Sequence, residues 1–299
     1  MINLLFTGNA GAYDGLAMSL LSITKHCKQE LNVIVLTMDL HEIKETYCPI
    51  SKEDIKLLED KIKLVNANNK ITLVDVTELF WQENGKSKNM ENSYSPYAFI
   101  RLLADKVEII PNKILYLDID IMANGDIAEL YDYDVTNYEY GAARDYYGRI
   151  FLSPIKHNYI NSGVMLLNME KIRRTKLFER CREVVNNKKM MFPDQSALNK
   201  CAQAKLYLPM KYNSQRRLHK TDVIRHFCKG IRWYPCWNYK SEKGKHCQPF
   251  SKHFKLFHTV NVKPWDIWGM HNILKCYEFD DIYEELIELK KLRGENCGK

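Results

Sequence analysis

The chain has 299 residues and a formal net charge of +7, with 45% hydrophobic and 27% charged residues. This composition is typical of a globular protein and excludes a collagen, a coiled coil and wholesale disorder. The length corresponds to one large domain or about two smaller ones, with enough residues for a sizeable core. No run approaches the roughly 18 consecutive apolar residues of a membrane-spanning helix. The apolar start, residues 1–6, lacks a basic leader, so we expect a first strand there and not a signal peptide.

The nine cysteines form no C-x-x-C pair, and their number is odd. Zinc ribbons and dithiol redox sites need that close spacing, so neither is predicted. Reduced thiols in a cytoplasmic protein are the simplest interpretation.

In chain order, short apolar segments alternate with helical ones. We predict strands at residues 3–7, 32–38, 71–76 and 114–117, and helices at residues 15–26, 56–65 and 97–107. Ser95 and Pro96 supply a hydroxyl cap and a first-turn proline for the last of these helices. This alternation, regular to about residue 170, predicts an α/β fold with a mainly parallel sheet. In such sheets, ligands bind beyond the carboxyl ends of the strands.

Residues 211–256 carry 12 Lys and Arg but only two acidic residues, together with several aromatic side chains. This balance favours contacts with phosphate, an anionic membrane surface or nucleic acid. A solvated basic face above buried aromatics would give the same composition, and both interpretations stay open.

Asp118 and Asp120 directly follow the apolar segment 114–117. On an extended backbone, the i, i+2 spacing places both carboxylates on one face, where a divalent cation would relieve their repulsion. Met122 and Ala123 stand where an EF-hand needs Asp or Asn and then Gly, which excludes that site. A glycosidase pair usually comes from separate elements about 5–10 Å apart. A purely structural pair at a turn remains the alternative.

The acidic pair Asp126 and Glu129 has the spacing of a helix N-cap with a capping box. We therefore predict a structural role for it at the start of a helix.

Further polar residues stand near predicted strand ends or helix starts, namely Asp145, Asn161, Asp194 and Gln195. Turn chemistry and helix-dipole compensation explain such residues equally well when each is taken alone. His258 ends an apolar run five residues before Lys263. Either it is a core histidine, or its imidazole joins the two carboxylates in a manganese site whose bound anion Lys263 would face.

Four segments occur in an order that resembles glycosyltransferase family 8. They are Leu-Tyr-Leu-Asp-Ile-Asp (115–120), Asn-Ser-Gly-Val-Met-Leu-Leu-Asn (161–168), Pro-Asp-Gln-Ser-Ala-Leu-Asn (193–199) and His258 with Lys-Pro-Trp (263–265). The resemblance implies a GT-A fold, a UDP-sugar donor, Mn²⁺ or Mg²⁺, and transfer with retention of anomeric configuration. It covers roughly residues 1–268, which we predict to be the catalytic domain, with 269–299 as a C-terminal helical extension.

The resemblance also assigns roles by matched position. Asp118 and Asp120, with Ile119 between them, correspond to the D-x-D motif, and His258 to the third metal ligand. Lys263 and Arg101 would contact the donor, Thr7 and Asn9 the uridine, and Asp145, Asn161, Asp194 and Gln195 the donor sugar. Two features depart from the family, since the acidic residue after the first strand and the glycine before Lys-Pro-Trp are missing.

We therefore predict a retaining enzyme that moves galactose or glucose from a UDP-sugar to a saccharide or glycoconjugate acceptor. Same-face attack, in which the departing phosphate takes the acceptor proton, is favoured over a covalent adduct on Asp194. The same reasoning predicts a cytoplasmic enzyme that docks peripherally at the inner face of an anionic membrane through residues 211–256, with no nucleic-acid partner.

Two other classes remain as hypotheses. A nucleotidyltransferase of similar fold needs a basic Gly-rich loop after the first strand, but the loop with Gly8 and Gly11 has no basic residue. A non-enzymatic module would bind nucleic acid or an anionic surface through residues 211–256.

Overall fold

The computed structural model describes residues 1–90, 96–146, 148–153, 155, 157–190, 192–215, 219–227 and 279–294. The predictions made for Ser95, His258 and Lys263, and for most of the basic segment 211–256, lie outside these ranges.

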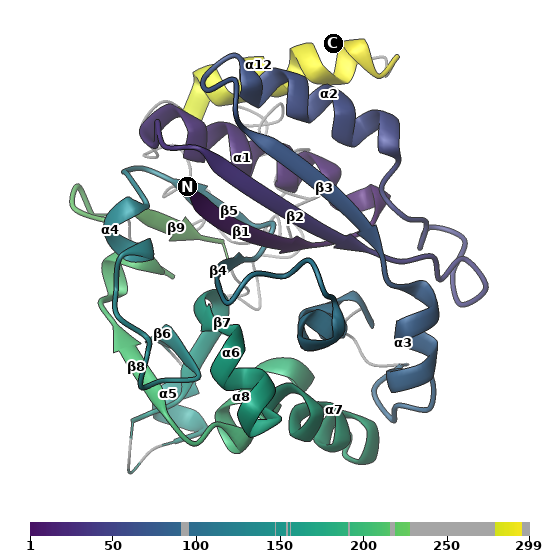
Figure 1. The fold of residues 1–299 in the computed structure, drawn as a ribbon, viewed down its shortest axis with the longest axis vertical. Helices are drawn as coiled ribbons and strands as arrows, with labels where there is room; N and C mark the ends of the chain where they lie inside the picture. The colour runs from purple at the N-terminus through teal and green to yellow at the C-terminus, as the bar shows by residue number, and fades with distance from the viewer. Residues whose placement is uncertain are drawn as a thin grey trace, which may run out of the picture.

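The centre of the fold is a seven-stranded sheet in the order β3-β2-β1-β4-β7-β6-β8 (Figure 1). The strands are β1 (Ile2–Thr7), β2 (Leu31–Thr37), β3 (Lys70–Asp75), β4 (Lys113–Leu117), β6 (Tyr140–Arg144), β7 (Ile160–Asn168) and β8 (Lys205–Leu208). Only β7 runs antiparallel to its neighbours, β4 and β6, and all other pairs are parallel. The predicted α/β fold with a mainly parallel sheet is confirmed.

Helices cover both faces of this sheet. One layer contains α1 (Tyr13–His26), α2 (Lys52–Lys63) and α12 (Phe279–Leu292), and the other contains α3 (Thr77–Asn84), the 3₁₀ helix η2 (Pro96–Lys106), α6 (Met169–Thr175), α7 (Leu177–Asn187) and α8 (Pro193–Cys201). Successive side chains of a strand point to opposite faces. Accordingly, Leu4 packs into the first layer and its neighbour Leu5 into the second.

Short elements complete the description. They are η1 (Ala10–Ala12), β5 (Ile121–Ala123), α4 (Ala128–Tyr131), α5 (Gly148–Phe151), η3 (Met210–Tyr212) and β9 (Ile224–His226). β5 and β9 form a separate two-stranded antiparallel sheet.

Two local predictions need correction. The capping box is wrong, because Asp126 accepts a hydrogen bond from the Ala128 amide at 2.9 Å while Glu129 pairs with Lys211 at 3.0 Å. The helix begins only at Ala128, so Glu129 lies within its first turn and faces a distant lysine. The helix predicted over 97–107 is present but has 3₁₀ geometry, and nothing in the contacts of the described residues explains the tighter winding.

The C-terminal helix α12 packs on α1 and α2 (Figure 1), and ion pairs from the helix and from the residue after it hold this end of the chain. Lys290 contacts Asp14 at 2.6 Å, and Arg293 contacts Asp54 at 2.7 Å. The domain boundary expected at 268/269 falls in an undescribed segment and stays a prediction. Among the helices that the structure describes, none is long and apolar enough to cross a membrane.

Arg182 of α7 joins three elements through a buried charge cluster. Its side chain is 2% exposed, donates to the Leu102 carbonyl and the Asp105 carboxylate, and pairs with Glu83 at 2.8 Å. Removing one partner of a buried ion pair typically costs about 3–5 kcal/mol, because the remaining charge is left uncompensated.

We therefore expect Arg182→Leu to lower the free energy of unfolding by about 3 kcal/mol in urea titrations. The exposed Arg174 on the preceding helix serves as the control, where Arg174→Leu should change stability by less than about 0.5 kcal/mol. Equal effects of the two substitutions would contradict this assignment.

Candidate active site

The site lies at the edge of the sheet where β1 and β4 end and β7 begins. Because β7 is antiparallel to β4, with Leu117 opposite Val164, its amino end lies beside the carboxyl end of β4. The Asp118–Asp120 turn connects β4 to β5 at this edge. It is fixed by the Asp118 amide, which donates to the Gly163 carbonyl at 2.8 Å, and by the Ser19 hydroxyl, which donates to the Ile121 carbonyl at 3.0 Å.

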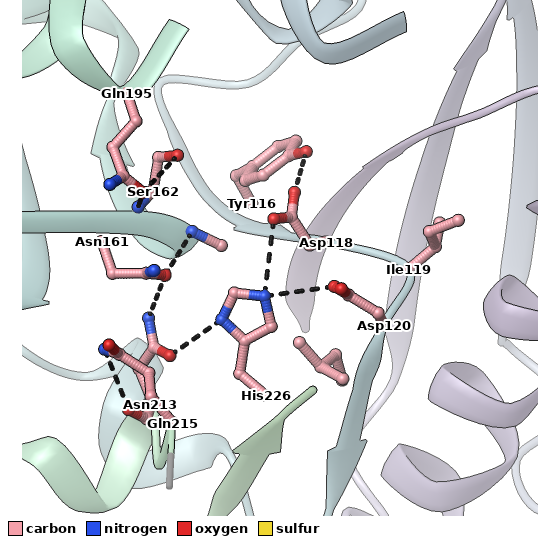
Figure 2. A network of polar contacts seen from close by, with 12 residues as sticks. Tyr116, Asp118, Ile119, Asp120, Asn161, Ser162, Gln195, Asn213, Gln215 and His226 are labelled. Atoms are coloured by element: carbon pink, nitrogen blue, oxygen red, sulfur yellow. Dashed lines mark hydrogen bonds and ion pairs between the residues drawn. The ribbon is translucent and has the colours of Figure 1, made fainter. Parts of the chain in front are cut away.

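A histidine from a segment distant in sequence lies against this turn. In the antiparallel β5–β9 pair, His226 lies opposite Ile121, and the Phe227 amide donates to the Asp120 carbonyl at 2.8 Å. This register places Nε2 of His226 3.1 Å from Oδ1 of Asp120 and 3.7 Å from Oδ2 of Asp118 (Figure 2). The imidazole is 2% exposed, and one ligand atom from each of the three residues lies within 4.8 Å of the others.

These three side chains fit a divalent cation by chemistry and by spacing. One imidazole nitrogen and two carboxylate oxygens form a mixed set that suits Mn²⁺ or Mg²⁺. Neighbouring ligands of an octahedral ion bound at about 2.1 Å lie roughly 3 Å apart, close to the distances between Nε2 and the two carboxylates.

Arg101 of η2 supplies the positive charge that this edge requires. Its guanidinium contacts Oδ1 of Asp118 at 2.7 Å, Oδ2 of Asp194 at 3.3 Å and the Ser162 carbonyl at 2.5 Å, and lies 4.1 Å from the centre of the Tyr116 ring. Burial opposes its charge, but Asp118 and the other neighbours raise its pKa above the usual value. Burial raises the pKa of Asp194, against the opposing effect of Arg101.

The two oxygens of Asp118 have different surroundings. Oδ1 accepts hydrogen bonds from Arg101 and, at 2.6 Å, from the hydroxyl of Tyr116, which also lies 3.3 Å from the Thr7 hydroxyl. Oδ2 faces His226. The donors on Oδ1 therefore turn Oδ2 toward the candidate cation position.

For His226 itself, burial works to lower the pKa, but the nearby carboxylate of Asp120 outweighs it and the pKa is raised.

A second polar group lies beyond β7. Oδ2 of Asp145 accepts from Nδ2 of Asn161 at 3.0 Å and from Nε2 of Gln195 at 3.2 Å. Oε1 of Gln195 accepts from the Ser162 amide at 3.1 Å, and the Ser162 hydroxyl donates to Asp194 at 3.3 Å. The segments around 145, 161 and 194, far apart in sequence, therefore meet.

The structure brings most of the predicted site residues to this edge, namely Thr7, Arg101, Asp118, Ile119, Asp120, Asp145, Asn161, Asp194 and Gln195. Asn9 follows the end of β1 and stands at the N-cap position of η1, where its side chain makes no capping hydrogen bond. The Asn-Ser-Gly segment lies within β7.

Sequence reasoning missed His226, Asn213 and Tyr116. The available signal was the Val-Ile-Arg-His segment 223–226, a short strand-like segment that ends at a histidine.

The fold and the site define a glycosyltransferase of the GT-A class. The chain belongs to glycosyl transferase family 8, which matches residues 3–269. It is 26% identical to a lipopolysaccharide 1,2-glucosyltransferase of Escherichia coli, with 93% of this chain and 83% of that protein aligned.

Solved structures share the fold at low sequence identity. The galactosyltransferase LgtC, in complex with donor and acceptor sugar analogues, superposes with a TM-score of 0.57 and 17% identity over 89% of this chain and 98% of LgtC. The bifunctional glycosyltransferase WbbM gives a TM-score of 0.59 at 13% identity, over 91% of this chain and 51% of WbbM. This chain thus spans about half of WbbM.

Replacing Arg101 tests the charge balance of the site. Arg101→Met would leave Asp118 and Asp194 without the cation between them, and we expect the free energy of unfolding at pH 7.5 to fall by about 3–5 kcal/mol. Without the guanidinium, the pKa of Asp194 should rise further above its unfolded value. A carboxyl group with a raised folded pKa binds its proton more readily when folded, so the deficit should shrink as the pH falls toward 5.

Urea titrations of wild type and variant at several pH values between 7.5 and 5 measure this difference. A deficit that stays constant or grows with falling pH would show that the cation does not compensate buried carboxylates.

Proposed function

We propose that this glycosyltransferase moves a hexose, galactose or glucose, from a UDP-sugar to a saccharide or glycoconjugate acceptor with retention, assisted by Mn²⁺ or Mg²⁺. The observation that carries this proposal is the convergence of Asp118, Asp120 and His226 at the sheet edge of a family 8 chain. Family membership also favours sugar transfer over the nucleotidyltransferase and non-enzymatic hypotheses.

Asp118, Asp120 and His226 would hold the metal ion. When bound, it would neutralise charge on the departing diphosphate as a Lewis acid. The resemblance predicts His258 in place of His226 as the third ligand, and Lys263 as a diphosphate contact. Substitution of each histidine distinguishes the two assignments. The buried and fixed Arg101 would keep the carboxylate of Asp118 in place without reorganisation during the reaction.

The polar group around Asp145, Asn161 and Gln195 supports a donor-sugar site. Its side chains offer amide donors and a carboxylate acceptor beside the metal ligands, the groups that orient sugar hydroxyls. The E. coli relative is named a glucosyltransferase and LgtC a galactosyltransferase, and both hexoses are compatible with the proposal.

The surroundings of Asp194 support same-face attack. A nucleophilic carboxylate must reach the anomeric carbon, whereas that of Asp194 is buried and engaged by Arg101 and Ser162. In the proposed route, the bond from the sugar to the diphosphate breaks and the bond to the acceptor oxygen forms on the same face. The acceptor proton passes to the departing phosphate oxygen.

The first test is Asp120→Asn, assayed as UDP release with UDP-galactose and UDP-glucose in the presence and absence of Mn²⁺. We expect a loss of roughly 10²–10³-fold or more in kcat, because one preorganised electrostatic contact has that effect. Mn²⁺ affinity should fall in parallel, with no change in thermal unfolding that would indicate misfolding.

Asp126→Asn is the matched control, since Asp126 is an exposed aspartate six residues along that accepts a hydrogen bond from the Ala128 amide. It should leave transfer unchanged. His226→Ala and His258→Ala, measured in the same assay, identify the imidazole ligand. Near-normal turnover by Asp120→Asn with metal added would refute the scheme.

We further propose that residues 211–256 dock this cytoplasmic enzyme at the inner face of an anionic membrane, beside a lipid-linked acceptor. This segment has twelve Lys and Arg residues and two acidic residues, a balance that supports attraction to anionic lipid. A juxtamembrane cluster of this kind gains about 1 kcal/mol per basic residue near an anionic surface.

Vesicle sedimentation tests this docking. Wild type should bind vesicles containing anionic lipid and dissociate as salt rises, whereas a variant with Lys240, Lys243, Lys245 and Lys252 changed to Glu should bind several-fold more weakly. Equal binding of the two proteins, or equal binding to neutral vesicles, would remove the docking proposal.

A further inference from the structure

The side of the His226 ring away from the aspartates is also fixed. Nδ1 lies 3.0 Å from Oδ1 of Asn213, and Nδ2 of Asn213 donates to Oδ1 of Asn161 at 3.0 Å (Figure 2). All three residues are buried, at 2%, 0% and 4% exposure. These side chains therefore form a continuous chain from the candidate metal position into the interior.

The direction of each hydrogen bond in this chain follows from one unambiguous donor. The Gly163 amide donates to the side-chain oxygen of Asn161 at 3.0 Å, and a backbone N–H can only donate. The Asn161 nitrogen then faces the carboxylate of Asp145, which accepts at 3.0 Å. Both ends of the Asn161 amide are thus assigned by partners that have a single role.

The orientation of Asn213 follows from that of Asn161. Because Oδ1 of Asn161 is an acceptor, the atom of Asn213 that faces it must be the amide nitrogen. The oxygen of Asn213 then faces Nδ1 of His226 and can only accept. Nδ1 must carry a hydrogen, so Nε2 is the ring nitrogen whose lone pair is available to a cation held by Asp118 and Asp120.

Gly163 has no side chain, and this leaves room for the His226 ring against β7. A Cβ atom at this position would lie 2.0 Å from Cε1 of His226 and 2.7 Å from each ring nitrogen. No side chain is compatible with those distances unless the ring moves. The Asn-Ser-Gly segment therefore makes room for the histidine ring. On what we call the sugar side, the group around Asp145 and Gln195, it contributes Asn161 and the Ser162 amide.

We propose that Asn213 and Asn161 are positioning residues that fix His226 as the Nδ1–H tautomer, on the seat formed by Gly163, and so present Nε2 to the divalent cation. This inference rests on the proposed function, since the cation is the one assigned to Asp118 and Asp120. Partners of this kind, which hold the second nitrogen of a metal-binding histidine, orient the ring and raise its basicity.

The inference extends to the sugar side, because Asp145 accepts from both Asn161 and Gln195. The tautomer of a proposed metal ligand and the orientation of the proposed sugar-binding side chains thus depend on the same chain of hydrogen bonds.

The tautomer is measured directly by long-range ¹H–¹⁵N correlation spectra of the histidine rings in the full-length protein saturated with diamagnetic Mg²⁺, with His226→Gln to assign the signals. The ion is needed because without it Nε2 faces the Asp120 carboxylate, which only accepts hydrogen bonds. Wild type should show Nδ1 protonated and Nε2 unprotonated at a pH where the ring is neutral. In Asn213→Leu this pattern should be lost. The dissociation constant for Mn²⁺, measured by electron paramagnetic resonance of free Mn²⁺ without donor, should rise about 10–100-fold.

Two further variants separate positioning from packing. Asn213→Asp keeps an acceptor against Nδ1 but places an oxygen against Oδ1 of Asn161, so it should lower thermal stability while retaining the Nδ1–H pattern. Asn69→Leu is the matched control, a buried asparagine that precedes β3 and bonds Leu31 and Ile62. It should lower thermal stability while leaving both readouts unchanged.

An Nε2–H tautomer in wild type, or an unchanged tautomer and Mn²⁺ affinity in Asn213→Leu, would overturn the inference. A loss of Mn²⁺ binding in Asn69→Leu equal to that in Asn213→Leu would also overturn it, since packing alone would then explain the effect. Failure of wild type to release UDP while it binds Mn²⁺ and Mg²⁺ counts instead against the proposed function, and the tautomer spectra still decide the role of Asn213. Absence of metal binding in wild type overturns both.

Discussion

The site depends on two carboxylates that follow the end of a central strand with one residue between them. Asp118 and Asp120 would repel each other in the partly buried turn after β4. Two groups compensate these negative charges. The buried guanidinium of Arg101 contacts one oxygen of Asp118, and the imidazole of His226 lies beside both aspartates. One oxygen is thereby engaged and the other left facing His226, so charge compensation and orientation of the ligands come from the same contacts.

The antiparallel strand β7 makes this arrangement possible. In an all-parallel sheet the amino end of β7 would lie at the opposite edge, whereas here residues 161–163 lie beside the end of β4. Their backbone bonds Asp118, their glycine admits the His226 ring, and their polar side chains face Asp145 and Gln195. A single short segment thus contributes to the metal side and to the sugar side.

The sequence predicts the α/β fold and the Asp118–Asp120 pair because strand alternation, helix periodicity and the i, i+2 spacing are local. It does not predict His226, whose place depends on the pairing of β9 with β5 over about a hundred residues of chain. Asn213 is hidden for the same reason, since its role exists only through its contacts with His226 and Asn161. The capping box failed because the helix begins at Ala128 with Ile127 at the N-cap position, one residue later than the Asp126–Glu129 spacing requires.

A buried chain of hydrogen bonds transmits orientation as well as stability. Each member from Gln195 through Asp145 and Asn161 to Asn213 has its donor and acceptor fixed by the next, so reversing one amide would leave like groups facing each other. An unsatisfied buried donor or acceptor costs about 1–3 kcal/mol, which strongly disfavours the reversed state. If the proposed ligands act as argued, a donor sugar that engages Asp145 or Gln195 would tighten the network that aims Nε2 of His226. Binding at the sugar side would then favour the imidazole geometry that the metal side requires.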